Sequence, residues 1–116
     1  MHSEPVEGED LSQEEYVRRA LDLYRRMPGT LGHVRRHDRV VATDLHRRRV
    51  PLAVVESALV LAAVRRTLRA GDAAPLAPVR SLAYFLPVIE EAIATPLPQD
   101  YIRYLRDKLA RYATRM

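Results

Sequence analysis

The sequence contains no cysteine and only four glycines in 116 residues. Without cysteine, neither a disulfide bond nor a thiolate-bound metal can hold the fold together. The few glycines leave little material for a catalytic loop, and neither a glycine-rich phosphate loop nor a Gly-x-Ser-x-Gly motif occurs. The most apolar segment is too short to cross a membrane, which takes roughly 18 to 20 residues, and no secretory signal pattern opens the chain. We therefore expect a cytoplasmic, non-catalytic protein without a cofactor.

Positive charge is concentrated in one part of the chain. Residues 18–69 hold thirteen arginines and four carboxylates, whereas residues 1–15 hold six carboxylates and no lysine or arginine. Lys108 is the only lysine, and a preference for arginine over lysine is typical of GC-rich genomes. Codon preference does not explain the local excess of positive over negative charge. Such an excess favours a surface that binds a polyanion, with an ordinary solvated surface as the alternative.

The acidic segment 1–10 has almost no apolar residue, so we expect a disordered tail. The remaining residues, 11–116, are enough for one domain that buries a modest core. Apolar residues recur with helical spacing, and apart from an ambiguous stretch around 39–41 no strand-like alternation appears. The sequence predicts an all-α fold, a compact bundle of about five helices.

The segment 51–70 is apolar on every side between Ala58 and Val64. A helix with no polar face is buried at the centre of its domain. Pro51 suits the first turn of this helix and Gly71 suits the position after its end. We therefore expect a buried central helix over 51–70, with the other helices packed around it.

Four further helices follow from capping and breaking signals. Ser12 and Glu15 form a capping box that opens a helix over 12–27. A basic helix lies within 31–48, or is shortened to 39–48 with Asp38 as its cap. Pro87 interrupts the segment 79–94, so we expect a kink or two short helices there. A last helix begins near Gln99 or Asp100 and is expected to bury these residues: Tyr101, Ile102, Leu105, Leu109 and Tyr112.

The segment 38–70 has the order of a helix-turn-helix unit. Its second helix begins with apolar residues, Leu52 to Val55, where a DNA-reading helix needs polar ones, so we do not expect it to read bases. We expect instead that the protein contacts phosphates without reading the sequence. The contacts are made by arginines on the basic helix, on the turn after it and at the end of the central helix: Arg35, Arg36, Arg39, Arg47, Arg48, Arg49, Arg65, Arg66 and Arg69. His33 and His37 are spaced like ligands on one helical face, but no carboxylate or cysteine completes a metal site.

Three stretches in this order, VRRTLR, PVRSLAYFLPVIEE and DYIRYLRDKL, carry a family resemblance. Residues 38–109 resemble the helical C-terminal modules of bacterial plasmid, phage and transposon replication proteins. The resemblance implies a DNA-binding accessory role in replication or mobility and identifies no catalytic residue. An alternative is a small subunit of a ribonucleoprotein such as a CRISPR effector complex, or of a protein assembly, with the basic face meeting RNA or an acidic protein.

Overall fold

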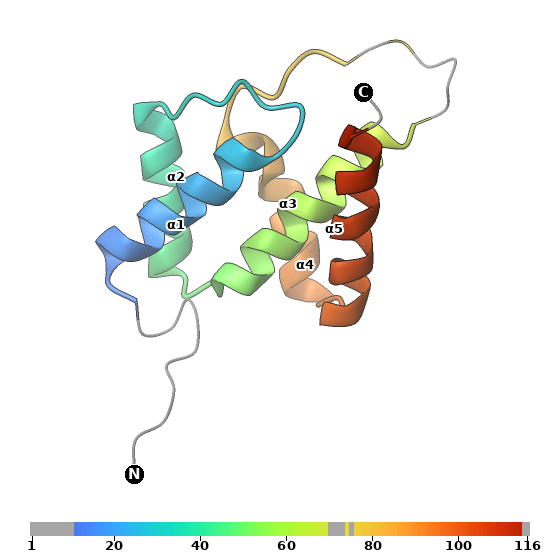
Figure 1. Cartoon of the computed structure of the whole chain (residues 1–116). Coiled ribbons are helices and arrows are strands. Elements are labelled where there is room, and N and C mark those ends of the chain that lie inside the picture. The colour runs from blue at the N-terminus through green and yellow to red at the C-terminus, as the bar shows by residue number, and fades with distance from the viewer. Residues whose placement is uncertain (1–10, 70–73, 75, 115–116) are drawn as a thin grey trace.

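The computed structural model describes residues 11–69, 74 and 76–114, and these form an all-α bundle (Figure 1). The helices are α1 (Gln13–Arg26), α2 (Arg36–Arg47), α3 (Leu52–Thr67), α4 (Leu86–Ala94) and α5 (Gln99–Thr114), with a 3₁₀ helix, η1 (Leu82–Phe85), before α4. The predicted fold class is confirmed. The predicted tail, 1–10, and Gly71 lie outside the described residues.

Helix α3 is the centre of the bundle, as its composition predicts. It packs against α1, α4, α5 and η1, and Figure 1 shows it between the α1–α2 pair and α5. Ala58 is completely buried and Val60 is 1% exposed, and these two residues lie about 200° apart around the helix, so opposite sides are covered. The helix is shorter than predicted, because Pro51 is its N-cap rather than its first residue and Leu68 follows its end.

Two hydrophobic clusters share α3. The larger joins α3 to α1, α2, η1 and α4, with the completely buried rings of Tyr16 and Tyr24 inside it. The smaller consists of three α3 residues, Val60, Ala63 and Val64, against three α5 residues, Ile102, Leu105 and Leu109. Helix α5 is therefore attached to the bundle mainly through α3, while α1 and α2 belong to the main core.

The buried face of α5 is narrower than the sequence suggests. Ile102, Leu105 and Leu109 are buried as predicted, but Tyr101 is 45% exposed and Tyr112 is 39% exposed. Both tyrosines flank the buried residues, and a single neighbouring helix covers only a limited arc of the α5 surface. The prediction that they belong to the core is wrong.

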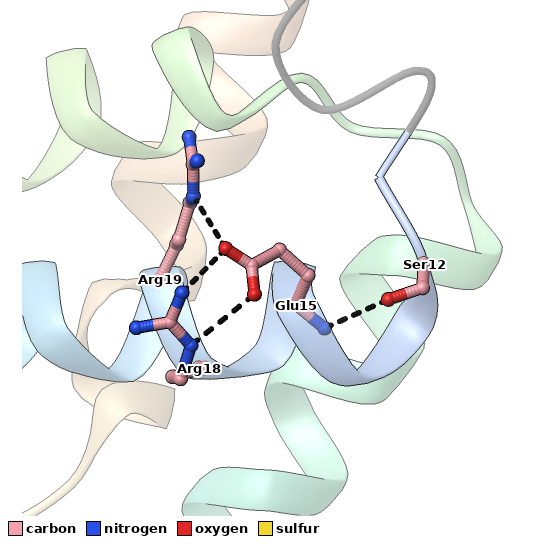
Figure 2. A network of polar contacts seen from close by, with 4 residues as sticks. All are labelled: Ser12, Glu15, Arg18 and Arg19. Carbon is pink, nitrogen blue, oxygen red and sulfur yellow. Dashed lines mark hydrogen bonds and ion pairs between the residues drawn. The ribbon is translucent and has the colours of Figure 1, made fainter.

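Helix α1 begins at a serine cap. The backbone N–H of Glu15 donates to the Ser12 hydroxyl at 3.1 Å, so the serine half of the predicted capping box is present. Figure 2 shows that the Glu15 carboxylate points instead toward Arg18 and Arg19 on the same helix. Hydrogen bonds from those two arginines lower the pKa of Glu15 below its ordinary value.

The start of α2 is fixed by Asp38, which is completely buried. The helix lies within the predicted segment 31–48, whereas the shorter alternative, 39–48, is wrong, because the helix begins at Arg36 and Asp38 lies inside its first turn. One carboxylate oxygen accepts from the backbone N–H of Arg35 at 2.8 Å, and the other accepts from the N–H of Leu82, also at 2.8 Å. Asp38 therefore caps its own helix and also fastens α2 to η1.

A tight turn joins α2 to α3. Val50 donates its N–H to the Leu45 carbonyl at 3.1 Å, and Arg49 donates to the His46 carbonyl at 2.9 Å. These bonds form a Schellman motif, in which the residue after the helix adopts a left-handed conformation. That residue is Arg49, with φ of 58°. The helix-turn-helix order of 38–70 is thus present. The two helices do not pack mainly on each other, however, because α2 packs on α1 and η1, whereas α3 packs mainly on α4, α5 and α1.

Pro87 divides the segment before α5 as predicted. Residues 82–85 form the 3₁₀ helix η1, and Pro87 lies in the first turn of α4, where its missing N–H breaks no helical hydrogen bond. Ahead of η1, Val79 pairs with the loop after α1 through hydrogen bonds with Gly29 and Leu31. None of the helices described is long and apolar enough to span a membrane.

Candidate nucleic-acid interface

Helix α2 presents a basic stripe on the side opposite its buried face. At 100° per residue, five side chains fall within an arc of about 100°. These residues, here called the α2 stripe, are Arg36, Arg39, Val40, Thr43 and Arg47. The three arginines are exposed and Val40 is 58% exposed. The stripe follows the helix for about 16 Å, given a rise of 1.5 Å per residue.

The arginines of the α2 stripe are free to take an external partner. In the described part of the chain, the guanidinium groups of Arg36, Arg39 and Arg47 have no hydrogen bond or ion pair. A carboxylate, Asp44, borders the stripe near its C-terminal end, and Asp38 is on the buried side. The three arginines lie on one face of α2, and no negative charge in the described residues pairs with them. This face is therefore well suited to bind anionic oxygens.

Hollows flank the stripe on both sides. One, of about 820 Å³, lies between α1 and α2, and the other, of about 670 Å³, lies between α2 and the start of α4 at Leu86. Arg39 and Thr43 line both hollows, so α2 forms the ridge between them. Arg18, Arg25 and Arg26 add positive charge to the first hollow, partly compensated by Asp22.

The other predicted arginines of this region have different surroundings. Arg35 precedes α2 and its backbone is bonded to Asp38. Arg48 forms an ion pair with Glu90 of α4, with 2.7 Å between Nη2 and Oε1. Arg49 is exposed in the turn. Among the six arginines predicted between 35 and 49, the structure therefore brings three into the stripe and ties Arg48 to the bundle.

The arginines at the end of α3 are engaged within the protein. Arg65 makes two hydrogen bonds to the Glu91 carboxylate, at 2.9 and 2.6 Å. Arg66 donates to the Tyr84 hydroxyl at 3.0 Å and to the Ala77 carbonyl at 2.8 Å. Arg69 donates to the Ala74 carbonyl at 2.8 Å. These three arginines, here called the α3-end set, bind α4, Tyr84 and the segment before η1. They do not form a second surface of unpaired arginines.

The apolar side chains at the start of α3 include two that are buried in the bundle. Leu52 is 2% exposed and Val55 is completely buried. Glu56, the first charged residue of the helix, pairs with Arg106 of α5 at 3.1 Å. Side chains in these positions face the bundle, so they are not available to bases.

Comparison with known proteins adds no relative. No protein-family model matches the chain, and no curated protein or solved structure is significantly similar to it.

The two histidines that share a helical spacing are not on one helix. His33 lies in the loop before α2 and His37 lies in its first turn, and both are exposed. Their i,i+4 spacing has no geometric meaning across that boundary. No cluster of three or more histidine, aspartate or glutamate side chains suited to a metal ion occurs in the described residues.

Exposed tyrosines are a feature that sequence reasoning missed. Tyr84, Tyr101, Tyr104 and Tyr112 are all between 39% and 52% exposed, and two of them, Tyr101 and Tyr112, were predicted to be buried. The rings of Tyr101 and Tyr104 lie 6.3 Å apart at 23°, a stacked arrangement, and the Lys108 ammonium lies 5.9 Å from the Tyr104 ring. Their spacing along α5, at positions i, i+3 and i+7, is the signal that marks them as one face.

Proposed function

We propose that this protein is a non-catalytic nucleic-acid-binding accessory protein that contacts phosphates through the α2 stripe. The observation that supports the proposal most strongly is the set of three guanidinium groups, on Arg36, Arg39 and Arg47, that have no partner in the described chain. Arginine suits phosphate because its planar fork can donate two parallel hydrogen bonds. A role in bacterial replication or in a mobile element, as the resemblance implies, is part of the proposal.

The α1–α2 hollow supports a contact wider than one helix. Arg18, Arg25 and Arg26 have exposed side chains, and each is paired only with a carboxylate of its own helix, Glu15 or Asp22. Exposed pairs of this kind contribute little to stability. They can therefore exchange their carboxylate for a phosphate at small cost, and the two helices together offer a basic surface of several turns.

A gel-shift titration with the full chain tests the proposal on duplex DNA, single-stranded DNA and RNA, each at about 50 and 200 mM salt. The test variant carries Arg36→Ala, Arg39→Ala and Arg47→Ala. A matched control removes the same charge from α5 by Arg103→Ala, Lys108→Ala and Arg111→Ala. We expect the wild type to bind, the α2 variant to bind roughly tenfold or more weakly on every sequence, and the control to change little. Absence of binding by the wild type, or equal losses in both variants, would contradict the proposal.

A second candidate is a subunit of a ribonucleoprotein or protein assembly, favoured by the α5 tyrosines. Exposed aromatic rings can stack on unpaired bases or anchor a protein interface. In that case Tyr101→Ala with Tyr104→Ala would weaken binding of single-stranded RNA, or of the protein partner, more than the α2 variant does. The same titration, repeated with this variant, separates the two candidates.

A further inference from the structure

The centre of the α2 stripe holds side chains that a purely phosphate-binding surface does not need. Val40 is 58% exposed between Arg36 and Arg47, and it has no group that could bind a phosphate. Thr43 lies one turn further along the same face and lines both flanking hollows. Arginine, threonine and small apolar side chains are the types that contact base edges. Arginine donates hydrogen bonds to O6 and N7 of guanine, threonine can accept or donate a hydrogen bond, and apolar side chains contact the methyl group of thymine.

The shape around α2 fits the major groove of duplex DNA. That groove is about 12 Å wide and admits one α-helix. A helix can enter it only if the protein recedes on both sides to leave room for the two phosphate strands. Hollows of about 820 and 670 Å³ lie on the two sides of α2, and arginines line each of them. The major groove of an RNA duplex is too deep and narrow for side chains to read.

We propose that α2, rather than α3, is the DNA-reading helix of this protein, entering the major groove with Arg39, Val40 and Thr43 toward the base edges. This inference rests on the proposed function and narrows it to duplex DNA read with sequence preference. Arg36 and Arg47, at the two ends of the stripe, contact phosphates. The buried Asp38, bonded to Leu82 of η1, fixes the depth and rotation of the helix relative to the rest of the bundle.

The decisive variants change the centre of the stripe without changing charge. Duplexes that bind the full chain are first selected from a random library. Val40→Ala with Thr43→Ala should then lower affinity for the selected duplex by about tenfold. Affinity for a random duplex, and its salt dependence, should stay as in the wild type, because no phosphate contact is removed. Val40 is exposed and Thr43 is only partly buried, so the variant is expected to fold, and its circular dichroism and unfolding midpoint verify this.

A probe on the DNA side tests the same contact independently. Replacing guanine by 7-deazaguanine in the selected duplex keeps the phosphates, the pairing and the minor groove but removes the N7 acceptor. The wild type should lose about tenfold in affinity, whereas Arg39→Ala should bind both duplexes equally.

The outcomes separate this inference from the broader proposal. Emergence of a preferred sequence, with the losses described, supports major-groove reading by α2. Binding that is equal for all duplexes, insensitive to 7-deazaguanine and unchanged by Val40→Ala with Thr43→Ala, overturns the inference while leaving phosphate binding intact. No binding to any nucleic acid overturns both.

Discussion

Two groups of arginines on this protein differ in what surrounds them. The α2 stripe holds three guanidinium groups without a partner in the described chain, whereas the α3-end set is bound to Glu91, Tyr84 and two backbone carbonyls. Both groups look alike in the sequence, where each belongs to an arginine-rich segment. The difference shows that local charge density does not define a binding surface. What matters is which cations remain uncompensated after folding.

Removing the buried carboxylate that anchors α2 is expected to have the largest effect on stability. Asp38→Ala would leave the buried N–H of Leu82 without an acceptor and would remove the acceptor of the partly buried Arg35 N–H, which together costs about 3 kcal/mol. Urea unfolding with circular dichroism measures this loss. Asp44→Ala removes an exposed aspartate from the same helix and should stay within about 0.5 kcal/mol of the wild type. Equal effects of the two substitutions would show that Asp38 does not anchor α2.

A second expected effect is a loss of stability at high pH, because of Tyr16. Its hydroxyl donates to the Val50 carbonyl at 2.5 Å, which ties α1 to the turn after α2. Burial raises the pKa of Tyr16 to about 12, from an ordinary value of 10.0. The folded state therefore holds this proton more tightly than the unfolded state does. The resulting stabilisation is complete below about pH 10 and is lost as the pH rises from about 10 to 12, by about 2 kcal/mol.

Urea unfolding at intervals between pH 9 and 12 checks the Tyr16 effect. Tyr16→Phe cannot ionise, so it should lose less stability over that range than the wild type. Parallel curves for the two proteins would mean that Tyr16 does not cause the alkaline loss.

A stabilising substitution is expected in the turn between α2 and α3. Arg49 has φ of 58°, a conformation that costs a residue with a side chain about 1 kcal/mol and costs glycine little. Arg49→Gly should therefore raise the unfolding free energy by about 1 kcal/mol. Arg47→Gly, the same change inside the last helical turn, should lower it by a similar amount. Calorimetry measures the change in unfolding free energy for both variants. A decrease for Arg49→Gly would indicate that the Arg49 side chain has a structural role.

The smallest expected effect concerns the two carboxylates of α4 that pair with arginines. Hydrogen bonds from Arg48 and Arg65 hold the pKa values of Glu90 and Glu91 below the ordinary range. Glu90→Gln with Glu91→Gln releases both arginines and should tighten nucleic-acid binding only about twofold, through net charge. The slope of affinity against salt should not change. An increase in that slope would show that the released arginines recruit phosphates.

The main elements of the fold were predictable because their signals are local. Pro51, Pro87 and the Thr95 to Pro98 turn mark helix boundaries wherever they occur, and the apolar run from Ala58 identifies a central helix. The start of α2 was not predictable from the same rules. Asp38 looks like an N-cap in the sequence, but one of its two hydrogen-bond partners is Leu82, which lies 44 residues away.

The candidate site was predictable only in part, for the same reason. Arg36, Arg39 and Arg47 belong to it by helical spacing, which the sequence contains. The partners of Arg65 and Arg66, however, are Glu91 and Tyr84, which lie 26 and 18 residues further along the chain. Pairing between such distant residues depends on packing, so the sequence alone could not separate engaged from free arginines.

The most direct test of the difference between the two arginine groups is the salt dependence of nucleic-acid binding. The slope of log affinity against log salt is measured for the wild type, for the α2 variant (Arg36, Arg39 and Arg47 to alanine) and for the equivalent α3-end variant (Arg65, Arg66 and Arg69 to alanine). Each lost phosphate contact reduces the slope by about 0.9, so the α2 variant should lose about 2 to 3 and the α3-end variant almost nothing. Equal reductions, or a larger reduction in the α3-end variant, would contradict the assignment of the interface to α2.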